Sequence, residues 1–267
     1  MNQENTLNTP SVETEELISH GFSVSHVRAQ SEQGTKDLKR PCGRYTTIST
    51  GPLGKLVDFE NACACLVEQL QPMLAPFFGK PLCICGIGNR DFEFDSLGPE
   101  VAKRIMSKVY EATAKKSNFE KIAIICPDVS TYTNLSTTSI ISSIASEMNA
   151  ACVLTIYSCH CGNLECLCSS IQLTNNGMQT YKEKMLFSQS SLGIPVISIS
   201  VPTAIRANAL SEAENCMPDF FLTPSHVSEA VRIAAFIIAC SITLIAYPYL
   251  DYEDCKQSIG LFLNGIV

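Results

Sequence analysis

Residues 82–100 read LCICGIGNRDFEFDSLGPE, an apolar run followed by a glycine-rich polar segment. The run Leu82 to Ile87 is continuous rather than alternating, which is typical of a strand buried on both faces of a sheet. Three later runs have the same character, Ile122 to Cys126, Val153 to Tyr157 and Val196 to Val201. The sequence therefore predicts at least four short buried strands.

Helix-length segments separate these runs. Pro99 to Lys116 and Thr137 to Asn149 lie between the first three runs, and apolar residues recur at helical spacing from Val57 to Leu74. Alternation of strand and helix is typical of a parallel sheet with right-handed crossovers. The predicted fold class is α/β, a single domain with a mostly parallel sheet and helices on both faces.

The chain divides at about residue 36. Residues 1–36 are polar and show no sustained apolar period, which predicts a loosely ordered leader or propeptide-like segment. Residues 37–267 form the predicted α/β domain. The first 20 residues lack the apolar core of a signal peptide, so we expect a cytoplasmic protein.

One apolar segment, Ile233 to Tyr247, resembles a membrane span. Its fifteen uncharged residues fall short of the roughly 20 that a bilayer requires. We therefore expect a buried helix and no membrane association.

Composition narrows the possible partners. The 19 Lys and Arg residues against 26 Asp and Glu residues give a net charge of −7, and the basic residues are scattered. Direct nucleic-acid binding needs a concentrated basic surface, so we expect none. The 14 cysteines of a large chain with its own apolar core are expected to be reduced thiols.

The loop after the first predicted strand is the richest candidate site, because ligands collect at the carboxyl ends of parallel strands. Pro99 is expected to be the first residue of the next helix, with a capping residue before it. A structural role of the loop aspartate remains the alternative to a role in a crevice, and the spacing fits neither a dinucleotide-binding fingerprint nor a P-loop. The candidate residues are Gly86, Gly88, Asn89, the aspartate Asp95, and Gly98 as the expected helix cap.

Five segments, in the same order along the chain, resemble motifs of the spore germination protease family. The early glycine-tyrosine-threonine segment, the glycine-asparagine loop, two later signatures and the start of the last helix are matched. They are residues 41–48, 86–99, 170–178, 192–203 and 223–224. Together they extend over roughly Pro41 to Pro248, most of the chain.

The resemblance implies an endopeptidase that degrades small acid-soluble spore proteins during germination, in the cytoplasm of the spore core of a Gram-positive bacterium. It also implies a homo-oligomer, synthesis as a zymogen, a fold like that of hydrogenase-maturation-type peptidases, and no cofactor. The members of this family use a pair of acidic residues.

Carried over by the motifs, one catalytic aspartate of the family falls on Asp95, and the position of the other falls on Tyr157. Two nearby carboxylates push their pKa values apart, so that one serves as a base while the other stays protonated. A tyrosine, with an ordinary pKa of about 10, does not replace such a base at neutral pH. Ser136 stands where the family has another acidic residue, and Gln179 to Glu183 replace a glycine-rich stretch.

Asp128 and Glu165 are the carboxylates that could substitute for the missing aspartate. Cys159 to Cys168 contains four thiols and an imidazole, but its one-residue gaps are not typical of zinc sites, so no metal is expected. Three hypotheses follow: an active endopeptidase, a catalytically silent paralogue that binds a protein partner, and a cysteine-dependent redox or metal module.

Overall fold

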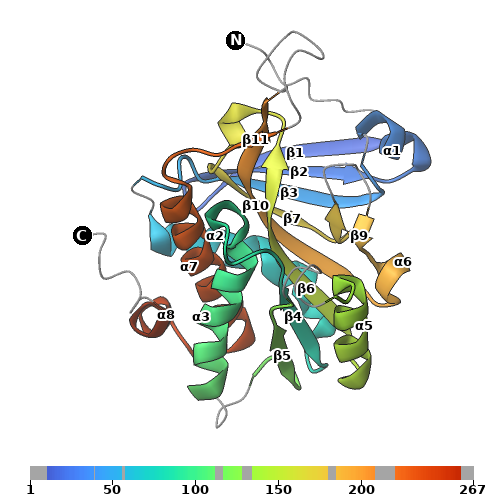
Figure 1. The fold of residues 1–267 in the computed structure, drawn as a ribbon, viewed down its shortest axis with the longest axis vertical. Helices are drawn as coiled ribbons and strands as arrows, with labels where there is room; N and C mark the ends of the chain where they lie inside the picture. Colours follow the sequence, from blue (N-terminus) through green and yellow to red (C-terminus); the bar gives the residue numbers. More distant parts are fainter. Residues whose placement is uncertain are drawn as a thin grey trace.

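The structure is a computed structural model, and it describes residues 11–38, 40–55, 58–111, 117–127, 134–179, 185–207 and 220–259. A mixed sheet of nine strands runs through the molecule (Figure 1), in the order β1-β2-β3-β7-β10-β6-β4-β5, with β11 paired to β10. Helices pack on both faces of this sheet, as expected.

The parallel half of the sheet consists of the four strands predicted from the apolar runs. They are β4 (Leu82–Gly86), β5 (Ile122–Ile125), β6 (Cys152–Cys161) and β10 (Val196–Arg206). Adjacent members pair in parallel, β5 with β4, β4 with β6, and β6 with β10. Every residue of β4 is buried, because helices cover both of its faces. The four predicted strands and their parallel pairing are confirmed.

The antiparallel half was not predicted. Its strands are β1 (Val12–Ser19), β2 (Phe22–Ala29), β3 (Gly43–Ser49), β7 (Ser170–Thr174) and β11 (Phe221–Leu222), and a separate ribbon pairs β8 (Met178–Gln179) with β9 (Met185–Phe187). Most residues of β1 and β2 are exposed or only partly buried, so their sequences mix polar and apolar residues and lack a continuous apolar run.

The expectation of a loosely ordered leader over residues 1–36 is wrong for residues 12–36. This stretch forms the hairpin β1–β2 and most of the short helix α1 (Glu32–Leu38). β2 pairs with β3 along its whole length, so the hairpin extends the sheet. Residues 1–10 lie outside the described part of the chain, and processing of the leader stays a prediction.

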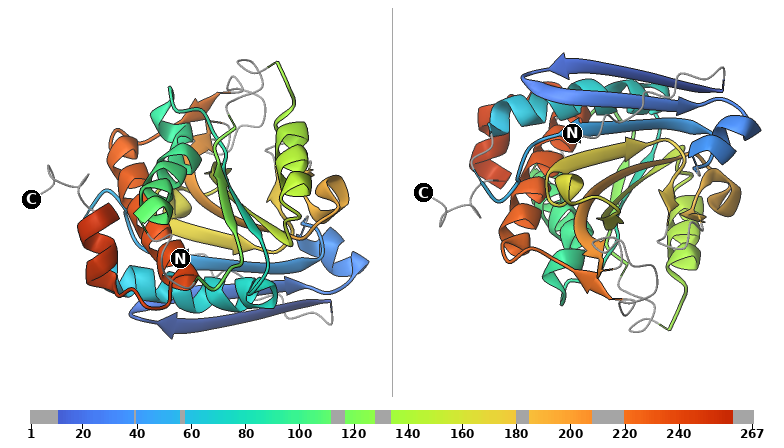
Figure 2. Two further views of the ribbon diagram at one scale, coloured as in Figure 1. Left: turned by 90° about the horizontal axis from the view of Figure 1, so that it is seen from below. Right: turned by 90° about the horizontal axis from the view of Figure 1, so that it is seen from above.

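Two hydrophobic clusters lie on opposite faces of the sheet. The larger cluster lies beneath α2 (Phe59–Leu74), α3 (Leu97–Glu111), α7 (Val227–Ala246) and α8 (Tyr252–Ile259). The smaller cluster lies on the other face beneath α5 (Thr137–Glu147) and α6 (Gln189–Leu192). Figure 2 shows α3 and α5 separated by the parallel strands. Successive residues of β4 alternate between the clusters, with Ile84 in the larger and Cys85 in the smaller.

α7 is the central helix of the larger cluster and packs against both α2 and α3. It is long and apolar enough to span a membrane, but 83% of its most apolar window is buried inside the fold. The expected buried helix is confirmed, and it begins at Val227, shortly after the Thr223-Pro224 segment that resembles the start of the family's last helix.

Candidate active site

The loop between β4 and α3 closes tightly on itself. A Cβ atom added at Gly86 would lie 2.2 Å from the carbonyl oxygen of Gly98, and one added at Gly98 would lie 2.5 Å from the carbonyl oxygen of Ile156. Such separations are far below van der Waals contact, so both positions require glycine. The two ends of the loop therefore meet at the carboxyl end of β4, beside β6.

The expected cap of α3 needs a correction. The helix begins at Leu97, and the amide of Glu100 donates to the carbonyl of Ser96, 2.9 Å away. Gly98 is therefore the second helical residue and Pro99 the third, where a missing N–H leaves no helical hydrogen bond unmade. The close contacts of Gly98, rather than a capping role, account for the glycine.

Asp95 ends a short 3-10 helix, η2 (Glu93–Asp95), and its carboxylate turns back into the loop. The backbone amide of Asn89 donates to its Oδ2 atom, 3.0 Å away. Gly88 has φ of +144°, and an added Cβ there would lie 2.0 Å from the carbonyl oxygen of Asp95. The side chain of Asn89 in turn accepts from the amide of Asp91, 2.9 Å away. The structure thus brings Gly88 and Asn89 against Asp95, whereas Gly86 and Gly98 contact each other at the two ends of the loop.

Burial raises the pKa of Asp95 from 3.8 to about 6, and the hydrogen bond from Asn89 opposes the shift. Burial penalises the charged form, whereas the donated N–H stabilises it. A carboxyl group with this pKa is ionised at neutral pH and is a much stronger base than an exposed aspartate. It therefore suits general-base chemistry near neutral pH.

A β-bulge in β10 connects the sheet to this loop. The pairing of β10 with β6 shifts register between Pro202 and Ala204, so that Thr203 is the extra residue. Its hydroxyl donates to the carbonyl of Phe94, 2.6 Å away, and the Thr203 side chain is buried. Thr203 is the last residue of the family-like segment 192–203, and the sequence assigns it no role, because a bulge has no signature in a single sequence.

Tyr157 lies at the same end of the sheet as Asp95. It is buried in β6, paired with Ser200 of β10, and the amide of Ile87 donates to the carbonyl of its neighbour Ile156, 2.8 Å away. The side chain of Ile156 belongs to the larger core cluster, so Tyr157 projects from the other face of the sheet.

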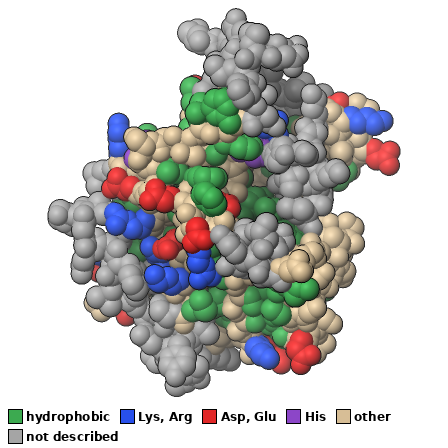
Figure 3. All heavy atoms as spheres, viewed as in Figure 1, with side chains coloured by type: hydrophobic (Ala, Val, Ile, Leu, Met, Phe, Trp, Pro, Cys, Tyr) green, Lys and Arg blue, Asp and Glu red, His purple; other side chains and the backbone are tan. Residues whose placement is uncertain are grey.

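Two exposed aromatic side chains belong to the loop that carries Asp95. Phe92 and Phe94 are 53% and 37% exposed, and their ring centroids lie 5.8 Å apart. Phe221 of β11 is also exposed, and its ring centroid lies 5.7 Å from that of His160. Figure 3 shows hydrophobic side chains exposed between acidic and basic ones on the face drawn there. The alternation of Phe92 and Phe94 with acidic residues is the sequence signal that could have pointed to these aromatic side chains.

Of the two acidic candidates, Glu165 lies within the described residues and Asp128 does not. Glu165 lies in η3 (Leu164–Cys166), exposed, with its carboxylate 3.4 Å from the side-chain amide of Asn163. Asp128 lies outside the described residues, as do residues 180–184. Ser136 caps α5 by accepting from the amide of Ser139, 3.1 Å away.

Within the described part of the chain, the cysteines are reduced and form no disulfide. Within those same residues, no group of three or more His, Cys, Asp or Glu side chains is arranged to hold a metal ion. Burial raises the pKa of Cys159 to about 12, so this thiol stays protonated at neutral pH.

These features define an α/β protein with a carboxylate of raised pKa at the carboxyl ends of its parallel strands. The model of the germination protease family matches residues 1–224, and the chain belongs to this family.

Similar proteins include the germination proteases of Caldanaerobacter subterraneus subsp. tengcongensis and Clostridium perfringens. The first is 27% identical over an alignment that covers 74% of this chain, and this chain spans only 64% of that relative's length. The second is 26% identical, with 94% of this chain and 91% of the relative aligned. Among solved structures, the [NiFe] hydrogenase maturation protease HycI from Thermococcus kodakarensis KOD1 matches with 14% identity and a TM-score of 0.37, over 66% of this chain and 99% of that one.

Proposed function

We propose that the protein is an endopeptidase that degrades small acid-soluble spore proteins during germination, in the cytoplasm of the spore core and as a homo-oligomer. The observation that supports catalysis most directly is the raised pKa of Asp95, because a buried carboxylate at a strand end suits a general base. Family membership supports the choice of a protein substrate.

In the proposed reaction, the Asp95 carboxylate accepts a proton from a water molecule whose oxygen attacks the scissile carbonyl carbon. The carbonyl C=O becomes a C–O⁻ bond in a tetrahedral intermediate. The proton then passes from Asp95 to the leaving amide nitrogen as the C–N bond breaks, which restores the carboxylate. We assign to the phenol of Tyr157 a hydrogen bond to the developing oxyanion, a role that a protonated tyrosine can fill.

A second candidate function is that of a catalytically silent paralogue, which keeps the fold and binds a protease partner or its substrates. The replacement of the family's second aspartate by Tyr157 favours this alternative, since Asp95 then lacks the carboxylate partner that would carry the second proton. Both functions predict binding of the spore protein, but only the first predicts cleavage.

The deciding experiment follows intact small acid-soluble spore protein by mass spectrometry during incubation with the purified chain. Asp95→Asn should abolish cleavage, while Asp91→Asn, an exposed aspartate of the same loop, should retain it. Tyr157→Phe should reduce the rate roughly 10- to 1000-fold if the phenol stabilises the oxyanion. Absence of cleavage by the native chain, with cleavage gained in Tyr157→Asp, would establish the silent paralogue.

The test of processing should remove residues 1–10 rather than residues 1–36. A cut at residue 36 would remove β1 and β2, expose the edge of β3 and delete the buried Val24 from the core. Cleavage activity that appears after removal of residues 1–10 would support synthesis as a zymogen.

A further inference from the structure

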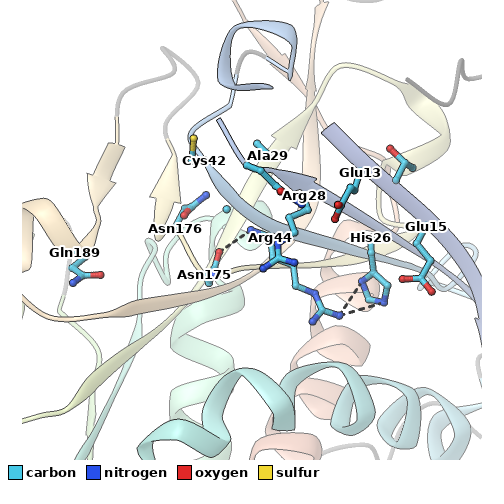
Figure 4. A pocket seen from close by; sticks show the side chains of 13 residues that line it. Glu13, Glu15, His26, Arg28, Ala29, Cys42, Arg44, Asn175, Asn176 and Gln189 are labelled. Carbon is cyan, nitrogen blue, oxygen red and sulfur yellow. Dashed lines mark hydrogen bonds between the residues drawn. The ribbon is translucent and has the colours of Figure 1, made fainter. Parts of the chain in front are cut away.

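A cavity of about 920 Å³ lies over the antiparallel half of the sheet. The strand register places its charged residues in two cross-strand rows, Glu13 opposite Arg28 and Arg28 opposite Arg44, then Glu15 opposite His26. Figure 4 shows these side chains together at the cavity, with Asn175 and Asn176, which follow β7, and Gln189 of α6 on the other side. The volume lies in the range of pockets that hold a ligand of several residues rather than a single ion.

The cavity is remote from Asp95. β3 and β10 both run antiparallel to β7, and both Tyr45 and Ser198 pair with Thr174. The start of β3 therefore lies at the amino-terminal end of β10, whereas Thr203 and the Asp95 loop lie at the other end. The two sites are at opposite ends of the parallel strands.

The two arginines keep their charge available to a ligand. Across the described residues, no carboxylate forms an ion pair with Arg28 or Arg44. The Nη2 atom of Arg44 lies 3.3 Å from Nδ1 of His26, and a guanidinium group can only donate, so this contact requires a neutral imidazole. Burial and, secondly, the charge of Arg44 lower the pKa of His26, while Glu15 opposes the shift.

The backbone amide of Arg44 holds the wall of the cavity in place. It donates to Oδ1 of Asn175, 2.9 Å away, and so ties the start of β3 to the end of β7. Asn176 lines the same wall, with its Nδ2 atom donating to the Pro41 carbonyl and the Tyr45 hydroxyl, and Gln189 supplies a further amide group. Different side chains therefore line different parts of the cavity. The carboxylates lie on β1, the guanidinium groups on β2 and β3, and the amide groups after β7 and in α6.

We propose that this cavity binds an extended protein segment that carries a carboxylate side chain close to a cationic one. The carboxylate contacts Arg28 and Arg44, the cation lies against Glu13 and Glu15, and the peptide backbone contacts the amide wall. A simple anion satisfies the arginines but gains nothing from the two glutamates, which repel it. A segment with both charges is complementary to the whole lining.

The test uses a fluorescein-labelled capped peptide, Ser-Glu-Ala-Lys-Ser-Gly, and fluorescence anisotropy at low ionic strength. Arg28→Gln and Arg44→Gln should each weaken binding about tenfold, as should replacement of the peptide's Glu by Gln. The matched control is Lys256→Gln, which removes one positive charge at an exposed position that lies on α8 and does not line the cavity. It should leave the affinity unchanged.

Three further measurements make the outcome decisive. Glu13→Gln should weaken binding of this peptide but not of its Lys-to-Gln version. Inorganic phosphate should compete only at concentrations far above those of the unlabelled peptide. Equal affinity of Arg44→Gln and Lys256→Gln, or equal competition by phosphate and peptide, would overturn the proposal. Asp95→Asn should bind as the native chain does, so that the result is independent of the proposed peptidase activity.

Discussion

The hydroxyl of Thr203 donates a hydrogen bond of 2.6 Å to the carbonyl of Phe94, the residue next to Asp95. Thr203 is buried in the bulge of β10, and Phe94 belongs to the loop that follows β4. One side chain therefore couples the sheet to the backbone that carries the candidate base. The loop is held elsewhere by the Ser228 hydroxyl, which donates to the Glu93 carboxylate, and by the Asn89 amide, which donates to Asp95.

Thr203→Val should lower the free energy of unfolding by about 1–2 kcal/mol, because the shape is kept while the donor is lost. If the contact positions Asp95, cleavage by the variant should fall further than the loss of folded protein explains. Chemical denaturation and single-turnover cleavage are the measurements. Thr203→Ser is the control, because it keeps the hydroxyl, and it should retain the activity that Thr203→Val loses.

Three Gly→Ala substitutions distinguish the cost of a positive φ from the cost of steric overlap. Gly162→Ala should change stability by no more than about 0.5 kcal/mol, since nothing lies within 4 Å of an added Cβ. Replacement of Gly79 by Ala should lower the free energy of unfolding by about 1–2 kcal/mol. Its φ is +75°, although nothing lies within 4 Å of an added Cβ. Gly88→Ala combines positive φ with a contact of 2.0 Å to backbone, and should cost about 3 kcal/mol or more.

Urea unfolding measures the free energy of unfolding of the three variants and so gives the order of their losses in stability. A Gly88→Ala protein as stable as Gly79→Ala would show that the Asp95 loop moves freely, and would contradict a rigid site around this carboxylate.

The raised pKa of Asp95 makes a prediction about stability and pH. Its pKa is about 6 in the folded protein and 3.8 in the unfolded reference. The folded state therefore binds more protons between these values, and the contribution of Asp95 to stability falls as the pH rises from about 4 to 6. Asp95→Asn removes this penalty and keeps an oxygen to accept from Asn89.

At pH 7.5 the Asp95→Asn variant should be more stable than the native chain by about 1–2 kcal/mol, a value reduced for the partial exposure of the side chain. Near pH 4 the two proteins should unfold at the same temperature. Differential scanning calorimetry across this range is the measurement. A variant that is less stable at pH 7.5 would mean that the Asp95 carboxylate is held by a stronger partner than Asn89.

Thiol reactivity should follow burial. Cys42 is exposed, whereas burial raises the pKa of Cys83 to about 11 and that of Cys152 to about 12. Reaction with a disulfide reagent at pH 8 should show Cys42 in the fast phase and the two strand thiols in the slowest. Cys42→Ser should remove one equivalent from the fast phase, and all 14 thiols should react in denaturant. An unchanged fast phase would contradict the exposure of Cys42.

Sequence pattern succeeded where a strand is covered on both faces. Continuous apolar runs marked β4, β5, β6 and β10, because each of these strands needs apolar side chains in both clusters. The same reasoning missed β1 and β2, whose polar residues lie on a face that helices do not fully cover. Glu13, Glu15 and Arg28 then appeared to belong to a loose leader, although they line a cavity.

The sequence by itself determined the family, the parallel half of the sheet and the loop residues Gly86 to Gly98 around Asp95, since local spacing and collinear motifs carry that information. Only the tertiary structure decided the pKa of Asp95, the bulge that aims Thr203 at Phe94, and the meeting of Arg28 with Arg44. Each of these depends on desolvation or pairing between segments far apart in the chain, and a long-range contact leaves no periodic trace in the order of residues.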